Sequence, residues 1–257
     1  MERVQLEHKG KEWGVDRTGW KGGWISFDWI KRHPVLMVLG GVFVVVAIEY
    51  YSLPRVSAIE RLKFINPRNT ALIEARKTEH RGKPWDIDQR WIPLSSISSE
   101  LVHAMIVAED GTFYEHEGFD WYEVQESLER NWNEGRFARG ASTITQQLAK
   151  NLFLSMSRDP IRKLKEIIIT LRMERVLSKD RILELYLNLI EWGDGIFGIE
   201  AAAQHYLGKS ASGLTREEAA RLAAVVPSPL RHAPNSESRY VQSRTESILM
   251  RMEARGW

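Results

Sequence analysis

The most apolar part of the chain is a run of 14 residues, 35–48, without a charged side chain. Crossing a bilayer core takes roughly 20 helical residues, so this run needs its flanks to span one. Lys31 and Arg32 stand just before it, and the positive-inside rule then keeps the preceding residues in the cytoplasm. The pattern predicts a transmembrane signal anchor over 34–53, a cytoplasmic segment over 1–33 and an exported remainder.

Two other interpretations of this run stay open. One is a cleaved signal peptide, for which the Val-Ser-Ala sequence at 56–58 offers a weak cleavage match. The other is a core helix of a soluble domain, although a segment that is apolar on every face fits poorly in a small domain. The segment before the run is long for a signal peptide. We therefore expect an uncleaved, single-pass anchor in the cytoplasmic (inner) membrane, with the catalytic domain on the periplasmic side.

Residues 54–94 have little hydrophobic periodicity. Proline, arginine, asparagine and aspartate are mixed there, and the pattern allows a short helix near 57–64 and extended pieces around 91–93. The pattern then becomes helical. Four apolar residues with helical spacing form the first stripe, which ends at a pair of acids: Leu101, Ala104, Met105 and Ala108. We expect a periplasmic connector or jaw over 54–94 and the main domain over 95–235.

Asp159-Pro160 predicts the start of another helix, because an acid at the N-cap and proline at the first position are favoured there. Its apolar residues recur with helical spacing, and we expect them to lie in the core: Ile161, Leu164, Ile168 and Leu171. Asp180 predicts the cap of a further helix that continues to Trp192.

The last part of the chain is helical as well. Thr215-Arg-Glu-Glu218 matches a capping box, and prolines after the following apolar run stop that helix. A final amphipathic helix over 238–254 lies within a C-terminal segment, 236–257. Strand signals are sparse throughout, so the fold should be mostly α.

Composition excludes several classes of site. Lys and Arg together number 36 against 34 Asp and Glu, so the formal charge is only +2 and offers no global footprint for nucleic acid. The chain has no cysteine, which rules out disulfides, thiolate metal sites and cysteine nucleophiles. No second histidine stands at ligand spacing from His116, so we expect no histidine metal site.

Three stretches carry candidate chemistry. Glu109 ends a predicted helix and enters a loop with His116, so it could act as a general base, while a capping acid and a structural histidine are the plainer alternatives. The Ser-Thr-Ile-Thr-Gln-Gln run at 142–147 could bind a phosphate at a helix start. Alternatively, it simply contains more capping side chains than a helix N-terminus needs. Arg162 and Glu166, with the neighbouring Lys163, share one helix face, which is also typical of a solvated salt-bridged surface.

Together, five blocks in this order and spacing resemble the motifs of the peptidoglycan glycosyltransferase family (family 51 of the glycosyltransferases). The blocks are EDGTFYEHEG at 109–118, RGASTITQQLAKN at 139–151, RKLKE at 162–166, RILELYLN at 181–188 and GIFGIEAAAQHYLGK at 195–209. The likeness implies a lysozyme-like glycosyltransferase domain with a small membrane-proximal jaw lobe and a cleft between them. Bifunctional relatives carry a further transpeptidase domain, for which the 22 residues after Asn235 leave no room. The chain is thus similar to the monofunctional biosynthetic members.

The resemblance also implies a reaction. Its substrate would be lipid II, added to a nascent glycan strand with inversion and release of undecaprenyl pyrophosphate. Glu109 would be the base and Glu166 the second carboxylate, which assists pyrophosphate departure directly or through a divalent cation, Mg²⁺ or Mn²⁺. No other cofactor is implied. The implied substrate-binding residues are Asp110, Phe113, His116, Arg139, Ser142, Thr143, Gln146, Gln147, Lys150, Asn151, Arg162, Lys163, Glu184, Tyr186 and Asn188.

The same resemblance implies a membrane partner, sensitivity to moenomycin and recruitment by cell-division or elongation proteins, with no role for nucleic acid. Two rivals stay open. A lytic enzyme that cleaves glycan would use paired acids on a similar fold, but it has no need of a cationic pyrophosphate site. A catalytically idle membrane scaffold would not need the two glutamates.

Overall fold

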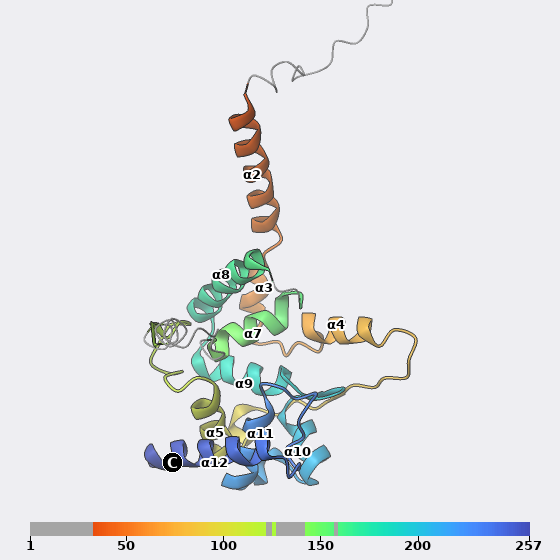
Figure 1. The fold of residues 1–257 in the computed structure, drawn as a ribbon, viewed down its shortest axis with the longest axis vertical. Helices are drawn as coiled ribbons and strands as arrows, with labels where there is room; N and C mark the ends of the chain where they lie inside the picture. Colours follow the sequence, from red (N-terminus) through yellow and green to blue (C-terminus); the bar gives the residue numbers. More distant parts are fainter. Residues whose placement is uncertain (1–32, 122–124, 127–141, 157–158) are drawn as a thin grey trace, which may run out of the picture. The chain divides into compact units, whose positions relative to one another are not determined.

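The computed structural model describes residues 33–121, 125–126, 142–156 and 159–257 (Figure 1). The implied substrate residue Arg139 lies outside these residues. The chain divides into two compact units, Met1–Tyr50 and Tyr51–Trp257. Helices dominate the described residues, as the hydrophobic pattern predicted.

The described part of the first unit is helical. Helix α2, Pro34–Tyr51, covers the apolar run and has no buried residue, so the alternative of a soluble core helix is wrong. By length and composition this helix is able to cross a membrane, which weakly supports a single-pass anchor. A signal peptide meets the same criteria.

The second unit begins with short elements. They are α3 (Val56–Arg61), α4 (Ala71–Glu79), β1 (Asp88–Gln89), the 3₁₀ turn η1 (Leu94–Ser96) and α5 (Ser99–Glu109). Helix α4 was not expected, because it buries only Leu72 and Ile73 and so shows little periodicity. Its start is set locally: Thr70 Oγ1 accepts a hydrogen bond of 3.1 Å from the backbone N–H of Ile73.

The remaining elements lie between residues 144 and 254. They are α7 (Ile144–Phe153), α8 (Pro160–Val176), α9 (Lys179–Leu189), β2 (Glu191–Gly193), β3 (Ile196–Phe197), α10 (Ile199–Leu207), the 3₁₀ turn η2 (Ala211–Gly213), α11 (Arg216–Val225) and α12 (Arg239–Ala254). Side chains cap five of these helices at the N-terminus: Thr143, Asp159, Ser178, Thr215 and Ser238. The predicted Asp159 cap and the Thr215 capping box are thus confirmed.

The expected helix from Asp180 to Trp192 is wrong at both ends. Ser178 is its N-cap, and the helix stops at Leu189 because the chain then forms β2. The sheet order is β1-β3-β2, with β1 parallel and β2 antiparallel to β3. Gly195 makes the hairpin turn with a φ of +74°, and a Cβ there would lie 2.3 Å from the carbonyl oxygen of Asp86.

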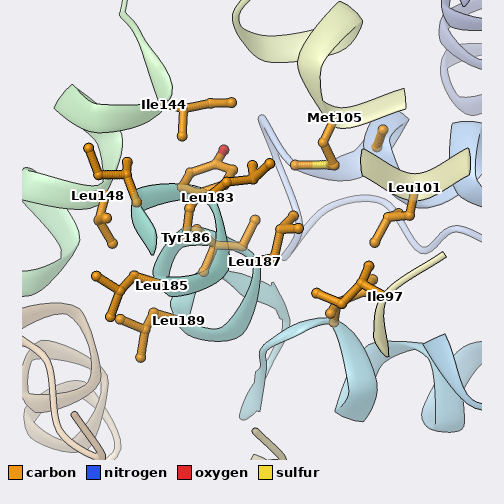
Figure 2. Close-up of a cluster of buried hydrophobic side chains, with 14 of the residues drawn as sticks. Ile97, Leu101, Met105, Ile144, Leu148, Leu183, Leu185, Tyr186, Leu187 and Leu189 are labelled. Atoms are coloured by element: carbon orange, nitrogen blue, oxygen red, sulfur yellow. The ribbon is translucent and has the colours of Figure 1, made fainter. Parts of the chain in front are cut away.

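Helix α9 is the centre of the hydrophobic core. Its residues from Leu185 to Leu189 are all buried, so it has no exposed face along that stretch. Figure 2 shows the Tyr186 ring directed toward Ile144 and Leu148 of α7, while Leu187 lies on the side of α5. Elements that precede α9 in the sequence, such as α7 and η1, and α10 after it therefore all pack on this one helix.

The expected core stripe of α8 is wrong at three of its four residues. Leu164 is 58% exposed and Ile161 is 45% exposed, and Leu171 is exposed as well. The buried residues of α8 are instead Glu166, Ile169, Thr170 and Met173. The helix packs against α7 with the face that carries Glu166, so most of its apolar stripe is exposed and only Ile168, partly buried, packs against the core.

Asn188 joins α9 to the segment before α5. Its side-chain amide accepts from the N–H of Ile92 at 3.0 Å and donates to the carbonyl of the same residue at 2.9 Å. Glu184, one turn earlier, accepts from the N–H of Leu94 at 2.9 Å. These contacts satisfy the backbone of a segment that lies between β1 and η1 and has no ladder partner of its own.

Replacing Asn188 with alanine should lower the free energy of unfolding by about 3 kcal/mol, because buried backbone groups of Ile92 lose their partners. Urea unfolding of the detergent-solubilised chain measures this. Asn69 hydrogen bonds to Glu74 at an exposed position, so Asn69→Ala is the control, with a change under about 0.5 kcal/mol. Equal losses in both variants would contradict the assignment.

Candidate active site

Glu109 ends α5 and is held from α7. Gln147 Nε2 donates to Glu109 Oε2 at 2.8 Å, and the Tyr186 hydroxyl donates to Gln147 Oε1 at 3.0 Å. Because the tyrosine hydroxyl supplies the proton on one side of the amide, the NH₂ group of Gln147 must face the carboxylate. The Glu109 side chain is 9% exposed, which leaves part of it open to solvent or substrate.

Opposing influences act on the Glu109 carboxyl. Burial raises its pKa, and the negative charge of Asp110 adds to that effect. The Gln147 hydrogen bond and the positive charges of Arg244 and Lys150 lower the pKa, but the net result is still a raised value. A carboxyl whose pKa is moved toward neutrality is suited to accept a proton from a substrate hydroxyl.

Asp110 and His116 both make structural contacts. Asp110 Oδ2 accepts from the N–H of Ile144 at 2.9 Å, while its Oδ1 lies 2.8 Å from His116 Nε2. The N–H of Gly118 donates to Nδ1 of the same ring at 3.0 Å, so Nε2 is the nitrogen that donates to Asp110. The loop after Glu109 is thereby tied to the start of α7, and the plainer interpretation of His116 is favoured.

The start of α7 is already capped by protein groups. Ile144 donates to Asp110, and the N–H of Gln146 donates to Thr143 Oγ1 at 3.2 Å. Thr143 Oγ1 itself donates to the carbonyl of Gly118 at 2.9 Å. These backbone N–H groups are therefore not free to cradle a phosphate, which favours the N-cap interpretation of this run.

Glu166 is the second acid and lies among cations. Its side chain is 5% exposed; Oε2 accepts from Arg162 Nη1 at 3.1 Å and Oε1 is hydrogen-bonded by Lys163 Nζ. The salt bridges of this face are therefore present, but the face is not fully solvated, because Glu166 is buried while Lys163 is 45% exposed. Burial lowers the pKa of Lys150 and the charges of Arg162 and Lys163 lower it further, whereas Glu166 and Glu109 raise it. Lys150 is thus electrostatically coupled to both acids.

A divalent cation does not fit the donors around Glu166. Both carboxylate oxygens already face cationic side chains, and carboxylate and carbonyl oxygens are what Mg²⁺ and Mn²⁺ require. Among the described residues no group of three or more His, Asp or Glu side chains could hold a metal. The expected cation at a pyrophosphate stays a prediction, and no step below passes through it.

Other predicted site residues have structural contacts. Phe113 is fully buried, with the Lys179 ammonium 4.6 Å from its ring centre. Glu184 and Asn188 bind the backbone at 92–94. Ser142 is exposed and Asn151 is half-buried on α7. Whether these residues also bind substrate stays a prediction.

A surface hollow of about 570 Å³ borders the loop after Asp110, and its lining includes Thr112, His116, Asp120 and Trp121. Another, of about 480 Å³, lies beside Trp91. Neither of the two is lined by Glu109 or Glu166. The cleft expected between a jaw and the main lobe therefore stays a prediction.

Residues 78–253 match the family model described as transglycosylase, which is more than half of the chain. The chain belongs to the transglycosylase family. A protein named biosynthetic peptidoglycan transglycosylase from Nitrosospira multiformis is 48% identical over 213 residues, which cover 82% of this chain and 93% of the relative. One of the same name from Dechloromonas aromatica is 48% identical over 193 residues, or 74% and 84% of the two chains. Another, from Neisseria gonorrhoeae, is 45% identical over 190 residues, or 73% and 82%.

These comparisons confirm that this transglycosylase is an enzyme of the glycosyltransferase class. They also confirm the predicted resemblance to the monofunctional biosynthetic members. The individual site residues stay predictions.

Arg244 of α12 is the site residue that sequence analysis missed. Its Nη2 lies 3.9 Å from Glu109 Oε1, and its Nε donates to the carbonyl of Ala224 at 3.0 Å. The one sequence signal was the seven-residue spacing of Arg244 and Arg251, which places both on the same helix face. Nothing in that spacing indicates which distant residue the face contacts.

Arg244→Gln should move the acid limb of the pH–rate profile of the transglycosylase to higher pH. Removing the positive charge raises the pKa of Glu109 further, so more of this carboxyl, the expected base, is protonated at a given acidic pH. Initial rates from pH 5 to 9, a range that spans the usual optimum of about 7, measure the shift. Arg244→Lys keeps the charge and should leave the limb in place; a shift in that variant instead would contradict the electrostatic explanation.

Proposed function

We propose that this transglycosylase polymerises lipid II into peptidoglycan strands in cell wall biosynthesis. The observation that carries the proposal is a pair of glutamates in contrasting surroundings on α5 and α8, two helices that each contact α7. Glu109 is desolvated and has its own hydrogen-bond donor, whereas Glu166 is ion-paired among cations. One acid is suited to remove a proton, and the cations around the other are suited to receive an anionic leaving group.

In the proposed reaction Glu109 takes the proton of the C4 hydroxyl of an incoming lipid II. The hydroxyl oxygen then attacks C1 of the donor sugar at the end of the growing strand. The bond from C1 to the phosphate oxygen breaks, with inversion from α to β, and the electron pair leaves with undecaprenyl pyrophosphate. Gln147 supports this step because it fixes the direction of the carboxylate.

Negative charge builds on the pyrophosphate as the bond breaks. Arg162, Lys163 and Lys150 form a local cationic group that stabilises such charge more in the transition state than in the ground state. Glu166 holds two of these cations in place and lets them remain charged in a partly buried site. A glycan-cleaving enzyme has no leaving pyrophosphate and no need of this group.

Glu109→Gln should reduce polymerisation by at least about a thousandfold, because the amide cannot accept the proton at neutral pH. The assay is gel separation of products from fluorescent lipid II with detergent-solubilised enzyme, and moenomycin is included as an expected inhibitor. Glu246→Gln is the matched control, since this acid is exposed on α12, and it should retain the wild-type rate.

The outcomes of that assay separate the rivals. Polymer from the wild type that is lost in Glu109→Gln supports the proposal. Shortening of preformed glycan strands without polymer would support a lytic enzyme instead. Full cellular function of Glu109→Gln would support a scaffold that recruits division or elongation proteins.

The enzyme should work at the surface of the cytoplasmic membrane, with α2 as its anchor. The apolar length of α2 supports this. So do the apolar residues of α8 that are exposed to solvent: Ile161, Leu164 and Leu171. Arg172 of α8 donates to the carbonyl of Pro54 at 3.0 Å, so α8 contacts the chain shortly after α2 ends. Lipid II carries a polyprenyl tail, and confinement to one surface raises its effective concentration.

Leu164→Cys labelled with an environment-sensitive fluorophore tests whether α8 contacts lipid. The chain has no native cysteine, so the label is unique in the full-length protein. In vesicles its emission should shift to the blue and be quenched by brominated lipids, because Leu164 is expected to meet acyl chains. The same label at Glu246→Cys should stay water-exposed. Identical emission at both sites would contradict the assignment.

A further inference from the structure

The loop around Glu109 is gripped by two arginines from the far end of the chain. Arg251 Nη1 donates to the carbonyl of Val107 at 2.8 Å, and Arg255 Nη1 donates to the carbonyl of Gly111 at 2.6 Å. These carbonyls stand two residues before and two residues after Glu109. The two guanidinium groups therefore hold the backbone on both sides of the proposed base.

The end of α5 explains why such contacts are needed. A helix leaves its last carbonyls without intrahelical donors. The N–H of Asp110 donates to Ile106, and the helix then ends, so the carbonyl of Val107 needs a donor from elsewhere. Arginine is suited to this because it carries several N–H groups and its positive charge is favoured at a helix C-terminus.

Gly111 leaves the room that Arg255 occupies. A Cβ at position 111 would lie 2.9 Å from Arg255 Nη2, closer than such atoms approach. The φ of Gly111 is not positive, so alanine is compatible with the backbone there. An added methyl group would therefore displace the guanidinium without straining the loop.

Helix α12 is a firm base for these two side chains. Ile248 and Met252 lie in the hydrophobic core, and α12 packs on both α11 and α5. After α12, Trp257 stacks on His103 of α5 with ring centres 4.3 Å apart. The arginines thus connect a fixed helix to the C-terminal end of α5, where backbone carbonyls have no intrahelical donor.

We propose that Arg251 and Arg255 are positioning residues that fix Glu109 for proton transfer. They act through the backbone and not on the carboxyl, which distinguishes them from Arg244. The inference rests on the proposed function of Glu109, because positioning matters only for a residue that acts on substrate. It predicts that their loss lowers kcat while KM for lipid II stays constant.

The test compares Arg251→Gln, Arg255→Gln and Gly111→Ala in the full-length, detergent-solubilised enzyme. Each should lower kcat about tenfold. Without the charge-assisted hydrogen bond the Glu109 carboxylate is held less firmly, and a small misplacement of a reacting group slows the reaction markedly. Arg251→Lys keeps a charged donor and should recover to within about threefold of wild type. Arg239→Gln is the matched control, because Arg239 is an exposed arginine at the opposite end of α12; it should leave kcat unchanged.

A second measurement does not depend on activity. Hydrogen exchange followed by mass spectrometry should show faster exchange in the peptide covering 106–116 for Arg251→Gln and Arg255→Gln, with α11 unchanged. If wild-type enzyme makes no polymer, the proposed function fails while this exchange still shows whether α12 holds the loop. Unchanged exchange at 106–116 overturns the positioning contact. Faster exchange at 106–116 together with a wild-type kcat overturns the catalytic part of the inference. So does a loss of exchange protection that also extends over α11 and α12.

Discussion

The hydrogen bond between Tyr186 and Gln147 is the contact on which the site depends. The tyrosine is fully buried between α7 and α9, and a buried hydroxyl without a partner costs roughly 2 kcal/mol. Gln147 supplies that partner, and its amide then has only one way to turn, with its NH₂ group toward Glu109. Packing of the core thus sets the direction of the proposed base, although neither α7 nor α9 contains it.

The two acids differ because their neighbours differ. Glu109 lies where burial outweighs the nearby positive charges, so its pKa is raised. Glu166 has a comparable exposure but faces Arg162 and Lys163 directly. Lys150 is influenced by both acids and links them electrostatically. The arrangement places the proposed proton acceptor on α5 and a cationic group on α7 and α8, which is what displacement of an anionic leaving group requires.

Helix α12 shows how the second unit uses the end of the chain. Its apolar face completes the core, and the arginines on it and at its C-cap contact α5 or the loop after α5 at three places around Glu109. The loop after α5 is also held from the other side, where Asp110 binds the start of α7. A loop that is held on both sides loses little conformational entropy when substrate binds, which suits the proposed proton transfer to Glu109.

Local signals in the sequence determined the mostly helical class, the caps at Asp159 and Thr215 and the order of the acidic and basic blocks, because capping and charge spacing act over a few residues. The same signals predicted the wrong buried face of α8. Ile161, Leu164 and Leu171 have the helical spacing of core residues but are exposed. Only the tertiary structure decided which face is buried, and it chose the one with Glu166 because that face meets α7. It also brought Arg244 to Glu109 across 135 positions of sequence, a contact that no local pattern encodes because it arises from the packing of whole helices.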